Sequence, residues 1–251
     1  PAPVSGPHAK YFRQLSRLSS AFAFLADSVL ILLGGKFKFK EKLSGRLADA
    51  LIHLYMGSAM LKKFEDDGRP EADLPLLRWA MDDSLHTIQT SLLGVLQNFP
   101  VPLLGGLVRL VTFPLGRSYS KAPDQVGKQA ARLLMSENET RDRLTDGIYV
   151  SDENDASGRV ITAFHLVLDS ARAEQAIRTA LKETVTVDNY TELVKRAVES
   201  GVITEEQATK VRQAQEAAAR VIAVDDFPRS EIEGLEESQF RPSAVQANQA
   251  G

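Results

Sequence analysis

Large apolar residues recur at spacings of three and four over three long stretches, and this period constrains the fold more than any other feature. Because an α-helix has about 3.6 residues per turn, such spacing places the apolar side chains on one face of a helix. The three stripes consist of Leu15, Leu18, Phe22, Leu25, Val29 and Leu32; of Leu43, Leu47, Leu51, Leu54 and Leu61; and of Leu77, Met81, Leu85, Ile88, Leu92, Val95 and Phe99. We expect these residues to face one common core.

Glycine and proline mark the ends of these helices. Gly34 and Gly35 follow the first stripe as a C-cap would, and the turn EDDGRPE follows the second. The third helix is expected to begin near Asp73, with Pro75 in its first turn, where a missing N–H costs nothing. Short connections make neighbouring helices antiparallel. The predicted fold is therefore all-α: an antiparallel helical bundle of three or four long helices followed by shorter packed helices.

The rest of the chain also has helical patterns. A short apolar helix is expected from Leu103 to Thr112, and DQVGKQAARLLM and SENETRDRL are typical of further short helices. Ser136 with Glu139, and Thr204 with Gln207, fit capping boxes. Longer helices are expected at residues 161–182, 188–200 and 204–224.

Composition suggests four segments. Proline and glycine crowd the opening PAPVSGPHAK, so residues 1–10 are expected to be a linker from a preceding domain. Residues 11–150 form the helical bundle domain, and residues 151–226 contribute additional helices. Residues 227–251 are expected to be a polar, partly disordered tail.

Charge is distributed unevenly along the chain. Residues 1–121 hold 15 Lys and Arg against 10 Asp and Glu, whereas residues 122–251 hold 15 against 23. An anionic partner is therefore expected to meet the first half. The chain has no cysteine, which excludes disulfides and thiolate metal sites and fits a cytosolic setting.

No segment is expected to span a membrane. The longest apolar run, from Ala21 to Leu33, is shorter than the roughly 20 residues that a spanning helix requires. Asp27 also interrupts it.

No catalytic or cofactor-binding residue can be assigned. The chain has neither a G-x-G-x-x-G turn after a strand nor a G-x-x-x-x-G-K-[ST] loop, so the usual phosphate cradles are absent. His8 falls in the expected linker, and His165 lies between apolar residues and is expected to be a packing residue.

Two carboxylate–imidazole pairs raise the question of a metal site. Asp49 with His53, and Asp82 with His86, lie one helical turn apart. Carboxylate-bridged metal sites in bundles use Glu-x-x-His motifs with further glutamates, and these are missing. We therefore interpret both pairs as residues flanking the core and expect no metal site.

A basic, aromatic row permits three interpretations; it consists of Lys36, Phe37, Lys38, Phe39, Lys40 and Lys42. Single-stranded nucleic acids are bound by such mixtures, but the acidic chain contains no recognised nucleic-acid fold, so no nucleic-acid partner is expected. In the second interpretation the lysines are solvated at the start of the second helix while the phenylalanines cover the turn. In the third the row contacts an anionic membrane surface.

The apolar segment from Val101 to Leu115 bears on the same question. It is too short to span a bilayer and very apolar for a surface in water. In the membrane interpretation Arg109 and Arg117 stay at the lipid phosphates while the apolar side chains enter the interface. The entering residues would be Leu103, Leu104, Leu107, Val108, Leu110 and Val111. Packing into the bundle or a dimer contact is the alternative, and the sequence leaves both open.

Several motifs together resemble a known family. L-G-G-K-x-K, L-S-x-R-L-x-D, K-x-F-E-D-x-G-R-P and F-P-L-G-R occur in this order, and the stretches around them are similar to the C-terminal region of long bacterial FadE-type acyl-CoA dehydrogenases. The resemblance runs from about residue 11 to residue 150 and continues more loosely to residue 229. The combination is far more specific than any single motif.

The resemblance implies an FAD-dependent enzyme of fatty-acid β-oxidation. Such enzymes desaturate fatty acyl-CoA to trans-2-enoyl-CoA: a carboxylate takes the α-proton, the β-hydride goes to the flavin, and an electron-transfer flavoprotein reoxidises it. The base and the FAD site belong to the dehydrogenase core upstream of this segment. The segment alone is therefore expected to be inactive and to bind no FAD.

The resemblance also implies partners. These are the dehydrogenase core of the same protein, a second copy in a homodimer, and the inner membrane, because an added domain in a comparable place serves dimer formation and membrane association in the very-long-chain mitochondrial enzyme. The implied location is the bacterial cytoplasm, peripheral to the inner membrane. The alternative is a stand-alone helical module that binds a membrane or a protein without enzymatic activity.

Overall fold

A computed structural model describes residues 4–223, and these form helices and connections without a strand. The chain divides into two compact units, residues 1–146 and residues 147–251. The predicted all-α class is confirmed. The expected tail at residues 227–251 and the first three residues of the expected linker lie outside the described residues.

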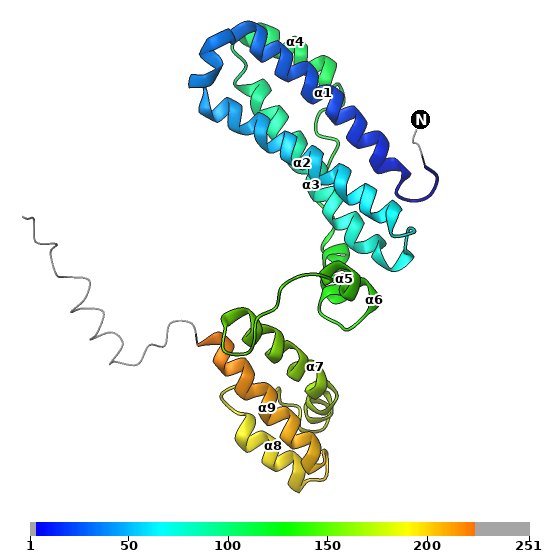
Figure 1. Cartoon of the computed structure of the whole chain (residues 1–251), viewed down its shortest axis with the longest axis vertical. Coiled ribbons are helices and arrows are strands. Elements are labelled where there is room, and N and C mark those ends of the chain that lie inside the picture. The colour runs from blue at the N-terminus through cyan, green and yellow to red at the C-terminus, as the bar shows by residue number, and fades with distance from the viewer. Residues whose placement is uncertain (1–3, 224–251) are drawn as a thin grey trace, which may run out of the picture. The chain divides into compact units, whose positions relative to one another are not determined.

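The first unit is a bundle built on three long helices. In Figure 1, α1, α2 and α3 run side by side, with successive helices antiparallel. The shorter helices follow α3 along the chain. The elements are α1 (Ala9–Leu33), the 3₁₀ helix η1 (Gly34–Phe39), α2 (Glu41–Asp66), the 3₁₀ helix η2 (Glu71–Asp73), α3 (Leu74–Gln97), α4 (Pro102–Thr112), α5 (Asp124–Leu134) and α6 (Glu139–Thr145).

The three predicted stripes form most of the core of this unit. Every stripe residue of α3 is buried, as are most of those on α1 and α2, while Phe22 is partly buried. Two predictions are wrong. Leu32 is 41% exposed because it lies at the end of α1, and Leu51 is 54% exposed because it faces away from α1 and α3 on the outer side of α2.

The chain enters the bundle earlier than expected. The linker was predicted to extend to residue 10, but α1 begins at Ala9 and His8 is only 3% exposed. The His8 ring packs edge-on against Phe64, and its Nε2 lies 2.6 Å from the Glu65 carboxylate. Burial alone would raise the pKa of Glu65, but hydrogen bonds from Arg69 and His8 outweigh it and lower the pKa. His8 therefore fastens the start of α1 to the end of α2.

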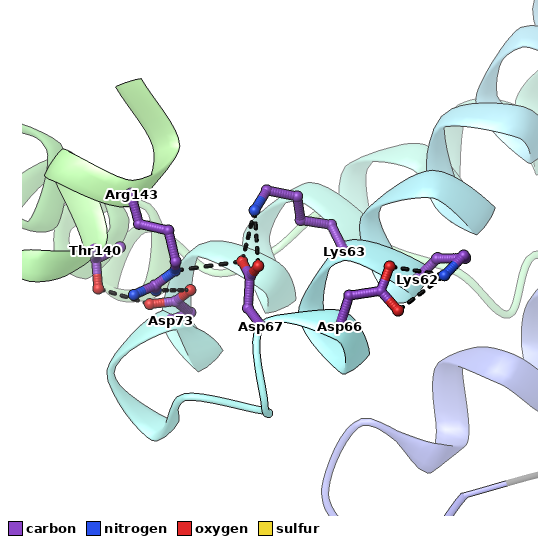
Figure 2. Close-up of polar contacts among 7 residues, drawn as sticks. All are labelled: Lys62, Lys63, Asp66, Asp67, Asp73, Thr140 and Arg143. Carbon is purple, nitrogen blue, oxygen red and sulfur yellow. Dashed lines mark hydrogen bonds and ion pairs between the residues drawn. The ribbon is translucent and has the colours of Figure 1, made fainter. Parts of the chain in front are cut away.

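A polar network fastens α6 to the turn between α2 and α3 (Figure 2). The buried Asp73 carboxylate accepts hydrogen bonds from the Thr140 hydroxyl at 2.6 Å and from the Arg143 guanidinium at 2.5 Å. Arg143 also donates to Asp67 at 3.3 Å, and Lys63 donates to the same carboxylate at 2.8 Å. The hydrogen bond from Lys63 holds the pKa of Asp67 below its usual range, and the hydrogen bond to Asp73 raises the pKa of Arg143. Each aspartate of this network is paired with a lysine or an arginine. No negative charge of the network is therefore buried without a partner.

The two predicted capping boxes have different outcomes. Thr204 and Gln207 form the predicted box at the start of α9. Ser136 does not cap α6, because the helix begins at Glu139 and Asn138 takes the N-cap position, its side chain accepting from the Arg141 amide at 3.0 Å. Asparagine is at least as favourable as serine at an N-cap.

The second unit is a smaller helical hairpin with a third helix. It consists of α7 (Ala156–Leu181), α8 (Tyr190–Glu199) and α9 (Glu205–Ile222), with α9 packed along α7. Ile177, Leu193, Val194 and Val211 are fully or almost fully buried in its core. His165, expected to be a packing residue, is exposed on α7, and its ring contacts the edge of Phe164 at 5.4 Å between centroids.

Core leucines of the first unit should be far more sensitive to truncation than the exposed leucine beside them. Replacing Leu25 or Leu54 by Ala should lower the free energy of unfolding by about 2–5 kcal/mol, because both side chains are buried. Leu51→Ala should change it by no more than about 0.5 kcal/mol. Trp79, the only tryptophan of the chain, lies on α3, so its fluorescence during urea unfolding reports on this unit. Equal losses at Leu51 and Leu54 would contradict the packing described here.

Candidate functional site

One end of the first unit brings the basic row and the apolar segment together. We call residues 30–46 and 98–115 the tip. In Figure 1 the end of α1, the start of α2 and the start of α4 lie at this end of the unit. A groove of about 690 Å³ lies between the end of α1, η1, the start of α2 and the α3–α4 connection. Leu33 and Phe39 line one part of it, and Asn98 and Pro100 line another. Two segments about 60 residues apart in sequence thus share one surface.

Residues 36–39 of the basic row lie in η1, and Lys40 and Lys42 lie at the start of α2. Lys36, Lys38 and Lys40 are exposed, and within residues 4–223 none of them forms an ion pair. The two phenylalanines differ: Phe37 packs against the core, whereas Phe39 is 74% exposed and lies 4.9 Å below the Lys38 ammonium. The prediction that both rings cover the turn is therefore right only for Phe37.

The outer side of α4 is an exposed apolar surface. Leu103 is 80% exposed, and Leu115, just after the helix, is 82% exposed. The exposed apolar residues of this segment are Val101, Leu103, Leu104, Leu107, Leu110, Val111 and Leu115. Packing of these leucines inside the bundle, one of the two alternatives from the sequence, is therefore excluded for the isolated chain.

The inner side of α4 holds it against the bundle. Val108, which the membrane interpretation placed in the lipid interface, is partly buried and packs against the core. A Cβ at Gly105 would lie 2.8 Å from the Phe99 Cβ and 3.2 Å from the Leu96 carbonyl oxygen, so glycine is required for this close approach. At the far end, the Arg17 guanidinium donates to the Thr112 carbonyl at 3.4 Å.

Cations border this apolar surface. Arg109 in the last turn of α4 and Arg117 beyond it are both exposed. Within the described part of the chain neither forms an ion pair. Of the eleven residues predicted from the sequence, nine are exposed, and Val108 and Phe37 are turned inward.

Sequence reasoning missed the apolar end of α1. Leu30, Ile31 and Leu32 are exposed beside η1. Judged by length and composition alone, the stretch Ala9–Phe39 is long and apolar enough to cross a membrane. By this criterion the prediction that no segment could span a membrane is wrong. The same test is passed by helices in the cores of globular proteins. Leu18, Leu25 and Val29 of this stretch are buried against the bundle, and we interpret α1 as a bundle helix with an apolar outer face.

A second exposed apolar surface lies on the outer side of α2. Its buried face is directed at α1 and α3, yet Leu51, Ile52, Tyr55 and Met56 are exposed. A helix that is apolar on both sides is typically buried on both sides. We call these four residues the outer face of α2.

Members of the two carboxylate–imidazole pairs contact other parts of the chain. Asp82 accepts a hydrogen bond from the Tyr11 hydroxyl at 3.0 Å, and burial together with this carboxylate raises the pKa of Tyr11. His86 Nδ1 lies 3.1 Å from the Tyr119 carbonyl oxygen, and His53 Nδ1 lies 3.5 Å from a serine hydroxyl. Within residues 4–223 no group of three potential metal ligands occurs.

The tip does not fit a flavin. A flavin dinucleotide needs a backbone cradle for its pyrophosphate and an enclosed slot for its ring. No glycine lines the groove, and Phe39, the only aromatic residue on its walls, is largely exposed. We therefore derive no redox step from these residues.

Comparison with protein families gives one match that spans most of the chain. The family model described as acyl-CoA dehydrogenase, C-terminal, bacterial type matches residues 1–227. The search of solved structures gives no significant match.

The contact between α4 and α3 provides a matched pair of glycines. Gly105→Ala should destabilise the first unit by about 1–3 kcal/mol, because the new methyl group would overlap the Phe99 side chain. Gly106→Ala should leave stability unchanged or raise it by up to about 1 kcal/mol, since nothing lies within 4 Å and alanine favours the helix. Urea unfolding followed by Trp79 fluorescence measures both. A harmless Gly105→Ala would mean that α4 does not pack in this way.

Proposed function

The chain belongs to the family of bacterial-type acyl-CoA dehydrogenase C-terminal domains, and we propose that it is the non-catalytic helical part of an FAD-dependent fatty acyl-CoA dehydrogenase that holds the enzyme on an anionic membrane surface. The dehydrogenase core supplies the base and binds the FAD and the acyl-CoA. That core acts in fatty-acid β-oxidation and returns its electrons to an electron-transfer flavoprotein. The enzyme is placed in the bacterial cytoplasm, peripheral to the inner membrane.

The tip is the observation that carries the membrane role. It combines an exposed apolar helix with four exposed cations that lack an ion pair within the described residues: Lys36, Lys38, Lys40 and Arg109. Arg117, also exposed, follows this segment. Each cation held near an anionic leaflet contributes about 1 kcal/mol of attraction. An exposed apolar surface of this extent marks a binding surface rather than an ordinary solvated one.

The length of α4 determines how the tip would bind. The helix has 11 residues, so it is about 16 Å long, roughly half of the hydrocarbon thickness of a bilayer. It is therefore suited to lie in the plane of the interface, with its leucines in the acyl region and its arginines at the phosphates. The exposed end of α1 extends the apolar contact.

The outer face of α2 supports a second contact, with protein. It is apolar and carries no cation of its own, so it offers nothing specific to an anionic surface. We assign it to the dehydrogenase core of the same protein or to a second copy in a homodimer. Family membership favours this arrangement over a stand-alone interaction module, because the family is defined as a part of a dehydrogenase.

Removal of two exposed leucines should weaken membrane binding while the fold survives. In the whole enzyme, Leu104→Ser with Leu107→Ser should lower the affinity for phosphatidylglycerol-containing vesicles about tenfold or more, because about 1.4 kcal/mol of lost apolar burial corresponds to a factor of ten. Cosedimentation with anionic and with phosphatidylcholine vesicles measures this, and circular dichroism checks the fold. Binding to the anionic vesicles should also fall as salt rises.

Val160→Ser with Val167→Ser is the matched control. Both valines are exposed on α7 in the second unit, so the same loss of apolar surface there should leave vesicle binding unchanged. If neither type of vesicle binds the unmodified enzyme, or if the control weakens binding as much as the leucine variant, the membrane role is wrong.

A further inference from the structure

The groove at the tip is bordered by more positive charge than the basic row alone provides. Besides Lys40, its walls hold Lys42 and Arg46 from the first turns of α2, against the single carboxylate of Glu41. Lys42 is the last lysine of the basic row, whereas Arg46 lies outside it. Within residues 4–223 no acid forms an ion pair with any of these three cations.

The antiparallel packing of α2 on α3 directs these side chains. Lys42 and Arg46 are four residues apart and share one side of α2. Gly94 lies in the last turn of α3, and Asn98 is the residue that follows this helix. A Cβ at Gly94 would lie 2.9 Å from both Cδ and Nε of Arg46, so the arginine crosses the helix where glycine leaves room. Asn98 closes the same wall, its side-chain amide donating to the Gly94 carbonyl at 2.8 Å. Arg46 is therefore partly buried against α3, unlike a freely solvated surface arginine.

This arrangement is unfavourable for the protein alone. Two cations at i and i+4 on a helix repel each other, and Lys40 adds a third positive charge at the same groove. A partly buried arginine with two neighbouring ammonium groups is a donor set suited to a phosphate group, because it offers directed N–H groups and point charges together.

We propose that this groove binds the phosphate group of an anionic lipid, with Arg46 as the directed donor and Lys40 and Lys42 as flanking charges. The inference rests on the proposed function and deepens it, because it assigns a specific binding site for a lipid headgroup in addition to general electrostatic attraction to the membrane. A lipid is favoured over a soluble phosphate by the surroundings of the groove. The exposed Phe39 ring forms part of its wall, and the exposed apolar helix α4 begins two residues after the lining residue Pro100.

The decisive experiment moves Arg46 without changing any charge. In the whole enzyme, Gly94→Ala places a methyl group where the arginine side chain lies, so affinity for vesicles of equimolar phosphatidylcholine and phosphatidylglycerol should fall about fivefold or more, since charge-assisted hydrogen bonds depend strongly on geometry. Alanine is the better helix former, so a weaker helix would not explain the loss. Gly45→Ala is the matched control: it lies beside Arg46 on α2 with nothing within 4 Å, and it should leave binding unchanged.

A second pair of variants separates the groove from the rest of the basic row. Lys42→Gln with Arg46→Gln should weaken binding about tenfold more than Lys36→Gln with Lys38→Gln, although each variant removes two charges. Inorganic phosphate in solution, titrated against the vesicle-bound enzyme, distinguishes the two sources of phosphate. When the total ionic strength is held constant, inorganic phosphate should not displace the enzyme from the vesicles.

Each contrary result has a distinct meaning. Suppose that vesicles bind the unmodified enzyme while Gly94→Ala and Gly45→Ala show the same affinity, or while the two double variants show equal affinities. In either case the groove is not a headgroup-binding site, and the proposed membrane role survives. If inorganic phosphate displaces the enzyme, the site takes a soluble anion and the assignment to a lipid is overturned. If no vesicle binds the unmodified enzyme, the proposed function and this inference both fall.

Discussion

The contact of α2 with α3 determines most of what is distinctive in this domain. α2 is apolar on two sides, but a bundle of three long helices can cover only the side that faces α1 and α3. Leu51, Ile52, Tyr55 and Met56 are left on the outer face of α2. Burial of such residues is favourable by roughly 25 cal/mol per Å², so an uncovered surface of this kind is a strong reason to expect a protein partner.

Glycine determines how closely the helices approach at three points. At Gly57 a Cβ would lie 3.1 Å from the Leu15 side chain, and at Gly105 it would overlap Phe99. At Gly94 the space is filled by Arg46 instead of an apolar side chain. Glycine thus permits two close helix contacts in the core and makes room for one cation at the tip. The local structure of the groove therefore follows from the packing of the bundle.

The periodicity predicted the helices, their order and most of the core, because apolar spacing directly reflects which side of a helix is covered. It placed Leu32 and Leu51 inside because it does not show where the covering layer ends. Arg46 was missed for another reason: its role depends on Gly94, a contact between distant positions that no local pattern signals. His8 was assigned to a linker because nearby proline and glycine outweighed a contact with Glu65 that only the fold provides.

The central claim is that the tip, and not another surface of the domain, meets the membrane. Hydrogen–deuterium exchange of the whole enzyme with and without phosphatidylglycerol-containing vesicles tests it most directly, since peptides covering η1, the start of α2 and α4 can be followed separately. We expect vesicles to slow exchange in residues 34–46 and 101–115 and to leave α7, α8 and α9 unchanged. Equal exchange at the tip in both conditions, or protection confined to the outer face of α2, would contradict the account.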